Sequence, residues 1–298
     1  MDRIKIIQKI LFAIFISLLP SCMPKQNLVK KHVELKQTLT KDKNITPKQP
    51  SITILIHGSR LFAPFDILLH PVAPAGLHPI QSFSPKHSMY QVATLLEEVD
   101  PERFQHATTY AFGWSGKLSF EARVKAAQDL YQALKPIIAE HKKQYNQDPE
   151  IRIISHSHGG NVALNLAKVK DLDELFTIKE LIMLAVPVQQ QTAIYAQDPI
   201  FEKIYSLYST MDSLQVLDPQ GLYRINEKKQ LTFSQRQFPV QKKLRQAKIK
   251  INGHGLNHIG FITFSFLKKL PSIIDELEFW ETEYPSKPGE ERLLALTA

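Results

Sequence analysis

Short runs of β-branched and apolar residues alternate with longer amphipathic runs from residue 51 onward, and this alternation restricts the possible folds most. The short runs predict buried strands, and apolar residues at three- and four-residue spacing predict helices between them. Such alternation favours a parallel sheet, because parallel strands need crossover connections. We therefore expect an α/β fold with a mostly parallel central sheet and helices on both faces. The predicted strands are Ile52–Ile56, Thr108–Phe112, Ile151–Ser155, Glu180–Ala185, Lys203–Ser209 and Lys248–Ile251.

Helices are predicted at Lys86–Val99, Ser119–Lys142, Gly159–Lys168 and Ile259–Glu276. The segment Arg60–Lys86 follows the first strand, contains five prolines and shows no regular period. Long irregular segments inside a compact domain are usually functional. A lid or substrate-facing loop and a packed surface excursion both fit this segment, and the sequence leaves the two open.

The first 22 residues have the pattern of an export signal, with basic residues before an apolar run that is short for a membrane span. The run ends in Leu19-Pro20-Ser21-Cys22, which resembles a bacterial lipobox. The resemblance implies that Cys22 carries a lipid and becomes the new N-terminus. Proline is unusual at the middle position, so ordinary signal cleavage without lipid stays an alternative.

The positive charge of the chain is concentrated near its start. The formal net charge is +8, but residues 1–50 hold ten of the 37 lysines and arginines and only three of the 29 acidic residues. The rest is therefore close to neutral, which argues against a nucleic-acid partner. Residues 23–50 are polar and rich in lysine, so we expect a flexible tether there and one folded domain over 51–298. Cys22 is the only cysteine, which excludes an intramolecular disulfide.

The segment Ile151–Ala167 reads as a buried strand, a turn of small residues and a helix that begins with glycines. Ser155-His156-Ser157-His158-Gly159 matches the nucleophile-elbow pattern Gly-x-Ser-x-Gly except that serine replaces the first glycine. Such a turn exposes a serine hydroxyl at the end of the sheet and directs helix N-terminal amides toward the same space. We predict that Ser157 is a catalytic nucleophile.

The first strand ends in Ile56-His57-Gly58-Ser59, and with the elbow this pair resembles the lipase and PGAP1-like branch of the α/β-hydrolase superfamily. The segments Tyr110–Trp114 and Leu184–Val188 agree with the resemblance, which covers most of residues 51–280. In that family the amide after the His-Gly pair completes the oxyanion hole. The resemblance therefore implies that the backbone N–H groups of Ser59 and His158 are the donors.

Family order places a carboxylate after the next-to-last core strand and a histidine after the last one. Asp212 stands at the first position, with Asp218 as a second candidate. His258 and His254 both stand at the other, and we favour His258 because it precedes an apolar helix-like run. The order Ser157, Asp212, His258 is the order of nucleophile, acid and base in α/β-hydrolases.

These residues imply a serine esterase or lipase-type hydrolase without a cofactor, whose partners are a lipid or other acyl-ester substrate and the membrane. We expect a lipoprotein of the bacterial cell envelope, or a secreted or periplasmic protein if Cys22 carries no lipid. His156 and His158 have metallohydrolase-like spacing, but Gly160-Asn161 replaces the Asp-His that such a site requires, so no metal is expected. The competing interpretation is an inactive hydrolase fold that acts as a binding module.

Overall fold

The computed structural model describes residues 28–33, 51–60, 72–171, 176–212, 214, 237–287 and 291–297. The predicted signal segment with Cys22, the second acid candidate Asp218 and residues 61–71 of the proline-rich segment lie outside these ranges. Within them, none of the helices has both the length and the apolar character that crossing a bilayer requires.

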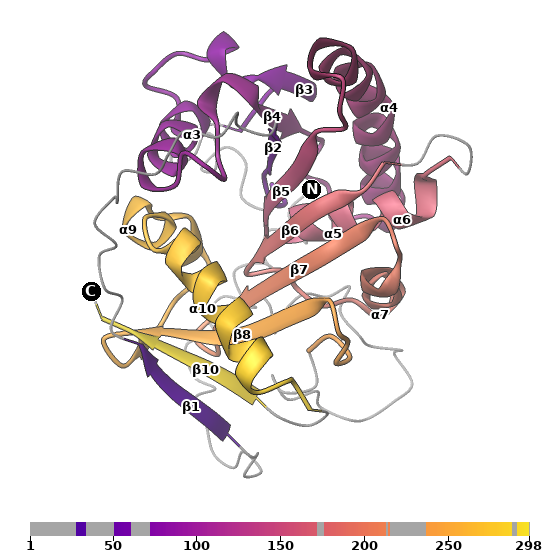
Figure 1. Ribbon diagram of the computed structural model, residues 1–298. Coiled ribbons are helices and arrows are strands. Elements are labelled where there is room, and N and C mark those ends of the chain that lie inside the picture. Colours follow the sequence, from indigo (N-terminus) through magenta and orange to yellow (C-terminus); the bar gives the residue numbers. More distant parts are fainter. Residues whose placement is uncertain are drawn as a thin grey trace, which may run out of the picture.

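One sheet organises the molecule (Figure 1). Its strand order is β1-β10-β8-β7-β6-β5-β2-β4-β3, with the short β9 paired to β8. All pairs are parallel except β3 with β4 and β9 with β8. The strands are β1 Leu28–Val33, β2 Ser51–Ile56, β3 Gly76–Pro79, β4 Thr109–Gly113, β5 Glu150–His156, β6 Ile178–Leu184, β7 Phe201–Tyr208, β8 Leu244–Ile251, β9 His254–Gly255 and β10 Glu291–Leu296.

Helices cover both faces of this sheet, which confirms the predicted fold class (Figure 1). One face carries α3 (Ser88–Val99), α9 (Phe264–Leu267) and α10 (Leu270–Glu283), whose apolar residues share a buried cluster with the strands. The other carries α4 (Phe120–Tyr145), α5 (His158–Leu164), α6 (Leu166–Val169) and α7 (Gln190–Ala193), packed around a second cluster. The inner strands β2, β5, β6 and β7 are therefore mostly buried on both faces, as their mainly apolar runs predict.

The six predicted strands are present with ends within four residues of those expected, but the described part of the chain contains four other strands that were not predicted. Strand β1 lies inside the segment 23–50 that we expected to be a flexible tether, and for these residues that expectation is wrong. The backbone of β1 pairs with β10, and this pairing does not require the apolar residues by which we predicted the other strands. Part of the proline-rich segment is regular as well, because β3 pairs with β4 and the 3₁₀ turn Ile80–Ser82 follows it.

The single helix predicted over Ile259–Glu276 is also wrong. That stretch contains a 3₁₀ turn at Ile259–Ile262, then α9 and then α10. The Thr263 side chain accepts a hydrogen bond from the Phe266 N–H and caps α9. Pro271 stands in the first turn of α10, where its missing N–H costs no helical hydrogen bond. The same apolar spacing is thus kept by separate helices that pack on one face of the sheet.

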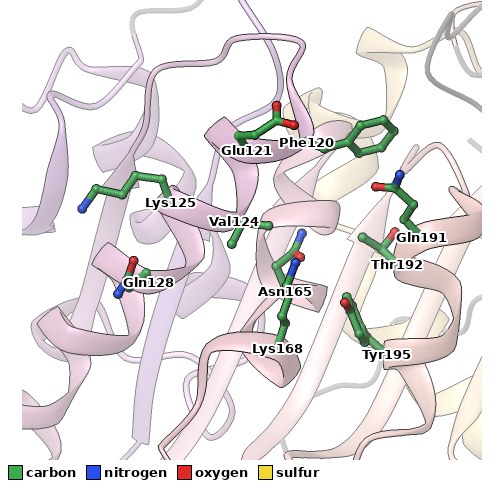
Figure 2. Close-up of a pocket in the computed structure, with 10 residues that line it drawn as sticks. All are labelled: Phe120, Glu121, Val124, Lys125, Gln128, Asn165, Lys168, Gln191, Thr192 and Tyr195. Carbon is green, nitrogen blue, oxygen red and sulfur yellow. The ribbon is translucent and has the colours of Figure 1, made fainter.

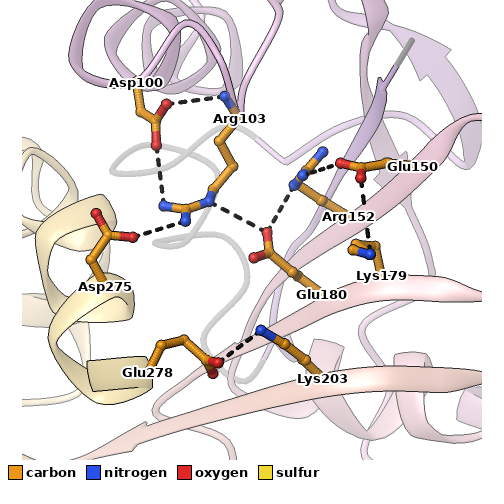
Figure 3. A network of polar contacts seen from close by, with 9 residues as sticks. All are labelled: Asp100, Arg103, Glu150, Arg152, Lys179, Glu180, Lys203, Asp275 and Glu278. Carbon is orange, nitrogen blue, oxygen red and sulfur yellow. Dashed lines mark hydrogen bonds and ion pairs between the residues drawn. The ribbon is translucent and has the colours of Figure 1, made fainter. Parts of the chain in front are cut away.

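A partly buried group of ion pairs connects the sheet to α10 and to the segment after α3 (Figure 3). Glu180 on β6 accepts a hydrogen bond from Arg152 Nε at 2.8 Å and lies 3.6 Å from Arg103 Nε. Arg103 also binds Asp100, at the end of α3, and Asp275 on α10. The side chains of Glu180 and Arg152 are each only 9% exposed, so the charges compensate one another away from water.

Candidate active site

The predicted nucleophile follows β5, at the place where the order of strands reverses. The chain builds β2 and β4 on one side, then crosses to add β5, β6 and β7 on the other. In an open parallel sheet such a reversal leaves a crevice at the carboxyl ends of the strands, where ligands usually bind. Ser157 comes after β5, and His57 comes after the neighbouring β2. Both residues therefore lie at the edge of the sheet that favours a site.

Ser157 occupies a strained turn between β5 and α5. Its φ of 52° and ψ of −136° are unusual for a residue with a side chain and cost on the order of 1–3 kcal/mol. The surroundings hold this conformation, because the Ser157 N–H donates to the Leu184 carbonyl at 2.9 Å. Strain of this kind concentrates at functional sites, and here it falls on the residue that the sequence singles out.

Close backbone packing explains the small residues around the turn. A Cβ atom at Gly159 would lie 2.5 Å from the carbonyl oxygen of His57, and one at Gly58 would lie 2.7 Å from the Cβ of Ser157. Neither contact is possible for a real side chain, so both positions require glycine. Ser155, which replaces the first glycine of the pattern, is buried and donates its hydroxyl to the Ile182 carbonyl at 3.2 Å. The serine is therefore accommodated by a hydrogen bond to β6.

The structure brings together the predicted acid and base, which are 46 residues apart in the chain. Nδ1 of His258 lies 2.8 Å from Oδ2 of Asp212, whose side chain is fully buried after β7. A carboxylate can only accept, so Nδ1 carries the hydrogen and Nε2 keeps its lone pair. His254 instead lies exposed on β9. Of the two candidate histidines, His258 is the one that pairs with Asp212. The catalytic roles of His258 and Asp212 stay a prediction.

His258 also lies against the end of β5. Its ring centroid is 4.6 Å from that of His156, the neighbour of Ser157 in the chain. The Nε2 atom of His156 donates to the His258 carbonyl oxygen at 3.0 Å. The predicted nucleophile, acid and base therefore occupy one edge of the sheet, on segments that follow β5, β7 and β9.

The two predicted oxyanion donors flank the elbow, since His158 begins α5 and Ser59 follows the glycine that packs on Ser157. His57 fixes the segment that contains Ser59. Its Nδ1 donates to the Gly58 carbonyl at 2.7 Å, and its Nε2 accepts the Trp114 N–H at 3.1 Å. Because a trans peptide directs C=O and N–H in opposite directions, the N–H of Ser59 points away from the His57 ring.

The contacts of His57 require a neutral ring. Burial, the largest cause, lowers the pKa of His57 from 6.5 to about 4. The Trp114 indole N–H also donates to the His57 carbonyl at 2.9 Å, and the two rings stack 5.9 Å apart. Trp114 belongs to the Tyr110–Trp114 segment noted in the sequence, but its contact with His57 depends on β2 and β4 being neighbours and could not be predicted.

This shift predicts a pH dependence of stability. The unfolded chain binds a proton at His57 near pH 6.5 and the folded chain only near pH 4, so the unfolded state holds more protons in between. The His57 contribution is therefore complete above pH 6.5 and is lost as the pH falls to about 4, by about 3 kcal/mol. Urea unfolding at both ends of this range measures it. His57→Asn, which keeps a donor for Gly58 but does not titrate, should lack this part of the loss; equal pH dependence in the two chains would contradict the prediction.

Asn161 on α5 was not predicted and holds the elbow helix in place. Its amide donates to the Pro187 carbonyl at 3.0 Å, and its carbonyl oxygen Oδ1 accepts the Thr192 hydroxyl at 2.5 Å. The Asn165 amide donates to the Asn161 backbone carbonyl at 2.7 Å. These bonds connect α5 to the segment between β6 and α7, which fixes the helix whose first amide is the predicted oxyanion donor.

A cavity of about 410 Å³ lies between α4, α6 and α7, away from these residues (Figure 2). Its lining is mixed, with Phe120 and Tyr195 beside charged and amide side chains. It includes neither Ser157 nor the His258–Asp212 pair, so the cavity and the candidate active site are separate features.

Among the residues that the structure describes, no three His, Cys, Asp or Glu side chains form a group suited to a metal ion.

No protein-family model matches this sequence, and no curated protein matches it either. Solved structures show a distant likeness. Carboxyl esterase 2 from the fungus Tuber melanosporum is 13% identical over 92% of this chain and 96% of its own, with a TM-score of 0.41. An esterase from Pyrobaculum calidifontis is 13% identical over 80% of this chain and 78% of its own, with a TM-score of 0.39. An alpha-beta serine hydrolase homologue from Coxiella burnetii is 16% identical over 76% of this chain and 88% of its own, with a TM-score of 0.38. The chain is thus distantly similar to these solved structures in fold alone.

Proposed function

We propose that this protein is a serine hydrolase that cleaves an acyl ester with Ser157 as nucleophile, His258 as base and Asp212 as the residue that orients the base. The observation that carries the proposal is the strained Ser157 turn at the same sheet edge as the His258–Asp212 pair. A buried carboxylate, an imidazole with a free Nε2 and a serine on a sharp turn are the components that activate a hydroxyl for acyl transfer.

The proposed reaction has two steps. Nε2 of His258 takes the proton of the Ser157 hydroxyl as the oxygen attacks the ester carbonyl, and the backbone N–H groups of Ser59 and His158 stabilise the negative oxygen that forms. His258 then protonates the leaving alcohol, which departs and leaves an acyl group on Ser157. Water, deprotonated by the same imidazole, then attacks the acyl carbon. The bond from that carbon to the Ser157 oxygen breaks, His258 returns the proton to this oxygen, and the acid leaves. Asp212 stays ionised and stabilises the charged imidazole.

The substrate class and location are proposals from the sequence. The lipase and PGAP1-like motifs favour a lipid or other acyl ester, and the segment ending at Cys22 favours a lipid anchor in a bacterial cell envelope. If Cys22 is not modified, a secreted or periplasmic enzyme is the alternative. Mass spectrometry of the mature N-terminus distinguishes the two, because acylation adds the mass of the acyl chains to a peptide that begins at Cys22.

Labelling of the purified full chain with a fluorophosphonate probe tests the hydrolase proposal. We expect wild-type protein to be labelled at Ser157 and the variants Ser157→Ala and His258→Ala to lose the label, with their thermal midpoints retained. Hydrolysis of p-nitrophenyl esters of increasing chain length would then define the acyl preference. A folded wild-type chain that is neither labelled nor active, also with lipid vesicles present, would favour the alternative of an inactive binding module.

A further inference from the structure

His156 is a candidate for a role that the proposed reaction does not yet give it. It is the last residue of β5 and is partly buried. Side chains alternate along a strand, so His156 lies on the same face as Ile154, which packs in the cluster that contains α9 and α10. The ring of His258 contacts His156 on this face of the sheet. The Ser155 side chain lies on the opposite face.

The contact between His156 and His258 joins two segments that are 102 residues apart. Nε2 of His156 lies 3.0 Å from the carbonyl oxygen of His258, and because a carbonyl only accepts, Nε2 is the donor. The rings are 4.6 Å apart and tilted by 51°, so they are in contact without stacking flat. His258 is thereby held at two points, its backbone by His156 and its ring by Asp212.

The segment that carries His258 has other fixed points, since the Asn252 N–H donates to the Leu296 carbonyl oxygen at 2.8 Å and Phe261 is buried, but it is largely exposed between them. It leaves β8 through a tight turn at Asn252 and Gly253, both exposed, and returns only two residues to the sheet as β9. His258 then starts a 3₁₀ turn whose next residue, Ile259, is 47% exposed. A base must stand within about 3 Å of the hydroxyl that it deprotonates, and an exposed hairpin alone fixes no such distance.

We propose that His156 is a positioning residue: its hydrogen bond to the His258 carbonyl fixes the base relative to Ser157, the next residue in the chain. This rests on the proposed hydrolase function and deepens it. The nucleophile and the support of the base are then adjacent residues on one strand end, so a displacement of β5 moves both together. A one-ångström error in such an arrangement costs up to about 100-fold in rate.

The test compares four full-length chains: wild type, His156→Gln, His156→Leu and His156→Phe. Glutamine places an amide donor near the position of Nε2, leucine removes the donor, and phenylalanine removes it but keeps a ring. We expect both variants without a donor to lower kcat for a p-nitrophenyl ester, and the rate of fluorophosphonate labelling, roughly 10- to 100-fold. KM should change by less than about threefold, and glutamine should restore most of kcat.

His78→Leu is the matched control. His78 lies on β3, and its Nε2 also binds a backbone carbonyl, that of Ala75 just before the strand, at 3.0 Å. We expect it to leave kcat unchanged. If leucine at 156 lowers the thermal midpoint, the phenylalanine chain provides the comparison. The inference would be overturned if His156→Leu and His156→Phe both kept the wild-type kcat, or if kcat of His156→Gln were as low as that of His156→Leu. In either case Ser157 would still be labelled. An unlabelled wild-type chain would instead contradict the proposed function itself.

Discussion

Replacing Asp212 with asparagine is expected to lower kcat for an ester substrate about 10⁴-fold. The Asp212 carboxylate is fully buried and accepts the Nδ1 hydrogen of His258 at 2.8 Å. An asparagine amide fits the same space but can donate to Nδ1, which moves the imidazole hydrogen to Nε2. That nitrogen then has no lone pair for the Ser157 proton. Steady-state kinetics at pH 8, with the thermal midpoint measured in parallel, checks the prediction.

Asp171→Asn is a suitable control for this substitution. Asp171 pairs with Lys135 at 3.1 Å and its side chain is 48% exposed, so the same chemical change there should leave kcat near the wild-type value. If Asp212→Asn keeps kcat within about tenfold of wild type, then Asp212 does not orient the base. In that case Asp218 becomes the candidate to test by the same substitution.

Replacing Glu180 with glutamine is expected to lower the free energy of unfolding by about 3 kcal/mol. Glutamine keeps the volume of the side chain but removes the charge that Arg152 and Arg103 share. Each arginine keeps another carboxylate, Glu150 or Asp275 among them, yet the buried positive charge is then less completely compensated. Urea unfolding followed by circular dichroism measures the loss.

Asp129→Asn tests whether that loss comes from burial. Asp129 pairs with Lys125 on the surface of α4, and the two side chains are 52% and 69% exposed. Removing this exposed pair should change the unfolding free energy by at most about 0.5 kcal/mol. A Glu180→Gln chain that loses no more than the surface variant would mean that the buried ion pairs in Figure 3 contribute little net stability.

The central strands could be predicted because each is buried on both faces and therefore has a mainly apolar sequence. Ile52–Ile56 and Ile151–Ser155 show this plainly. The edge strands could not be predicted in the same way. Strand β1 contains two adjacent lysines and no alternation, and only its backbone pairing with β10 makes it a strand. The helix predicted over Ile259–Glu276 failed for a related reason, since apolar spacing continues across caps such as Thr263.

The candidate site could be predicted as far as its residues follow strand ends. Ser157 and Asp212 stand directly after apolar strands, and the chain order of acid and base follows the family resemblance. The apolar run after His258 favours it over His254 in the sequence, but its contact with Asp212 depends on three-dimensional geometry. Asn252 and Gly253 both have positive φ, so the chain reverses tightly, exposes His254 and brings His258 back to Asp212. The Asn-Gly pair is a local signal for the turn, but no local pattern shows which histidine meets Asp212.

The order of strands has a consequence for how this chain folds. From β5 the sheet grows outward in chain order through β6, β7, β8 and β10, so each new strand meets an edge that already exists. The final partner of β10 is β1, which is made first. Until residues 291–296 pair with the sheet, β1 has no partner and β8 remains an open edge, which is a surface prone to wrong pairing. Chains that lack β10 should therefore be more prone to aggregate than the full chain.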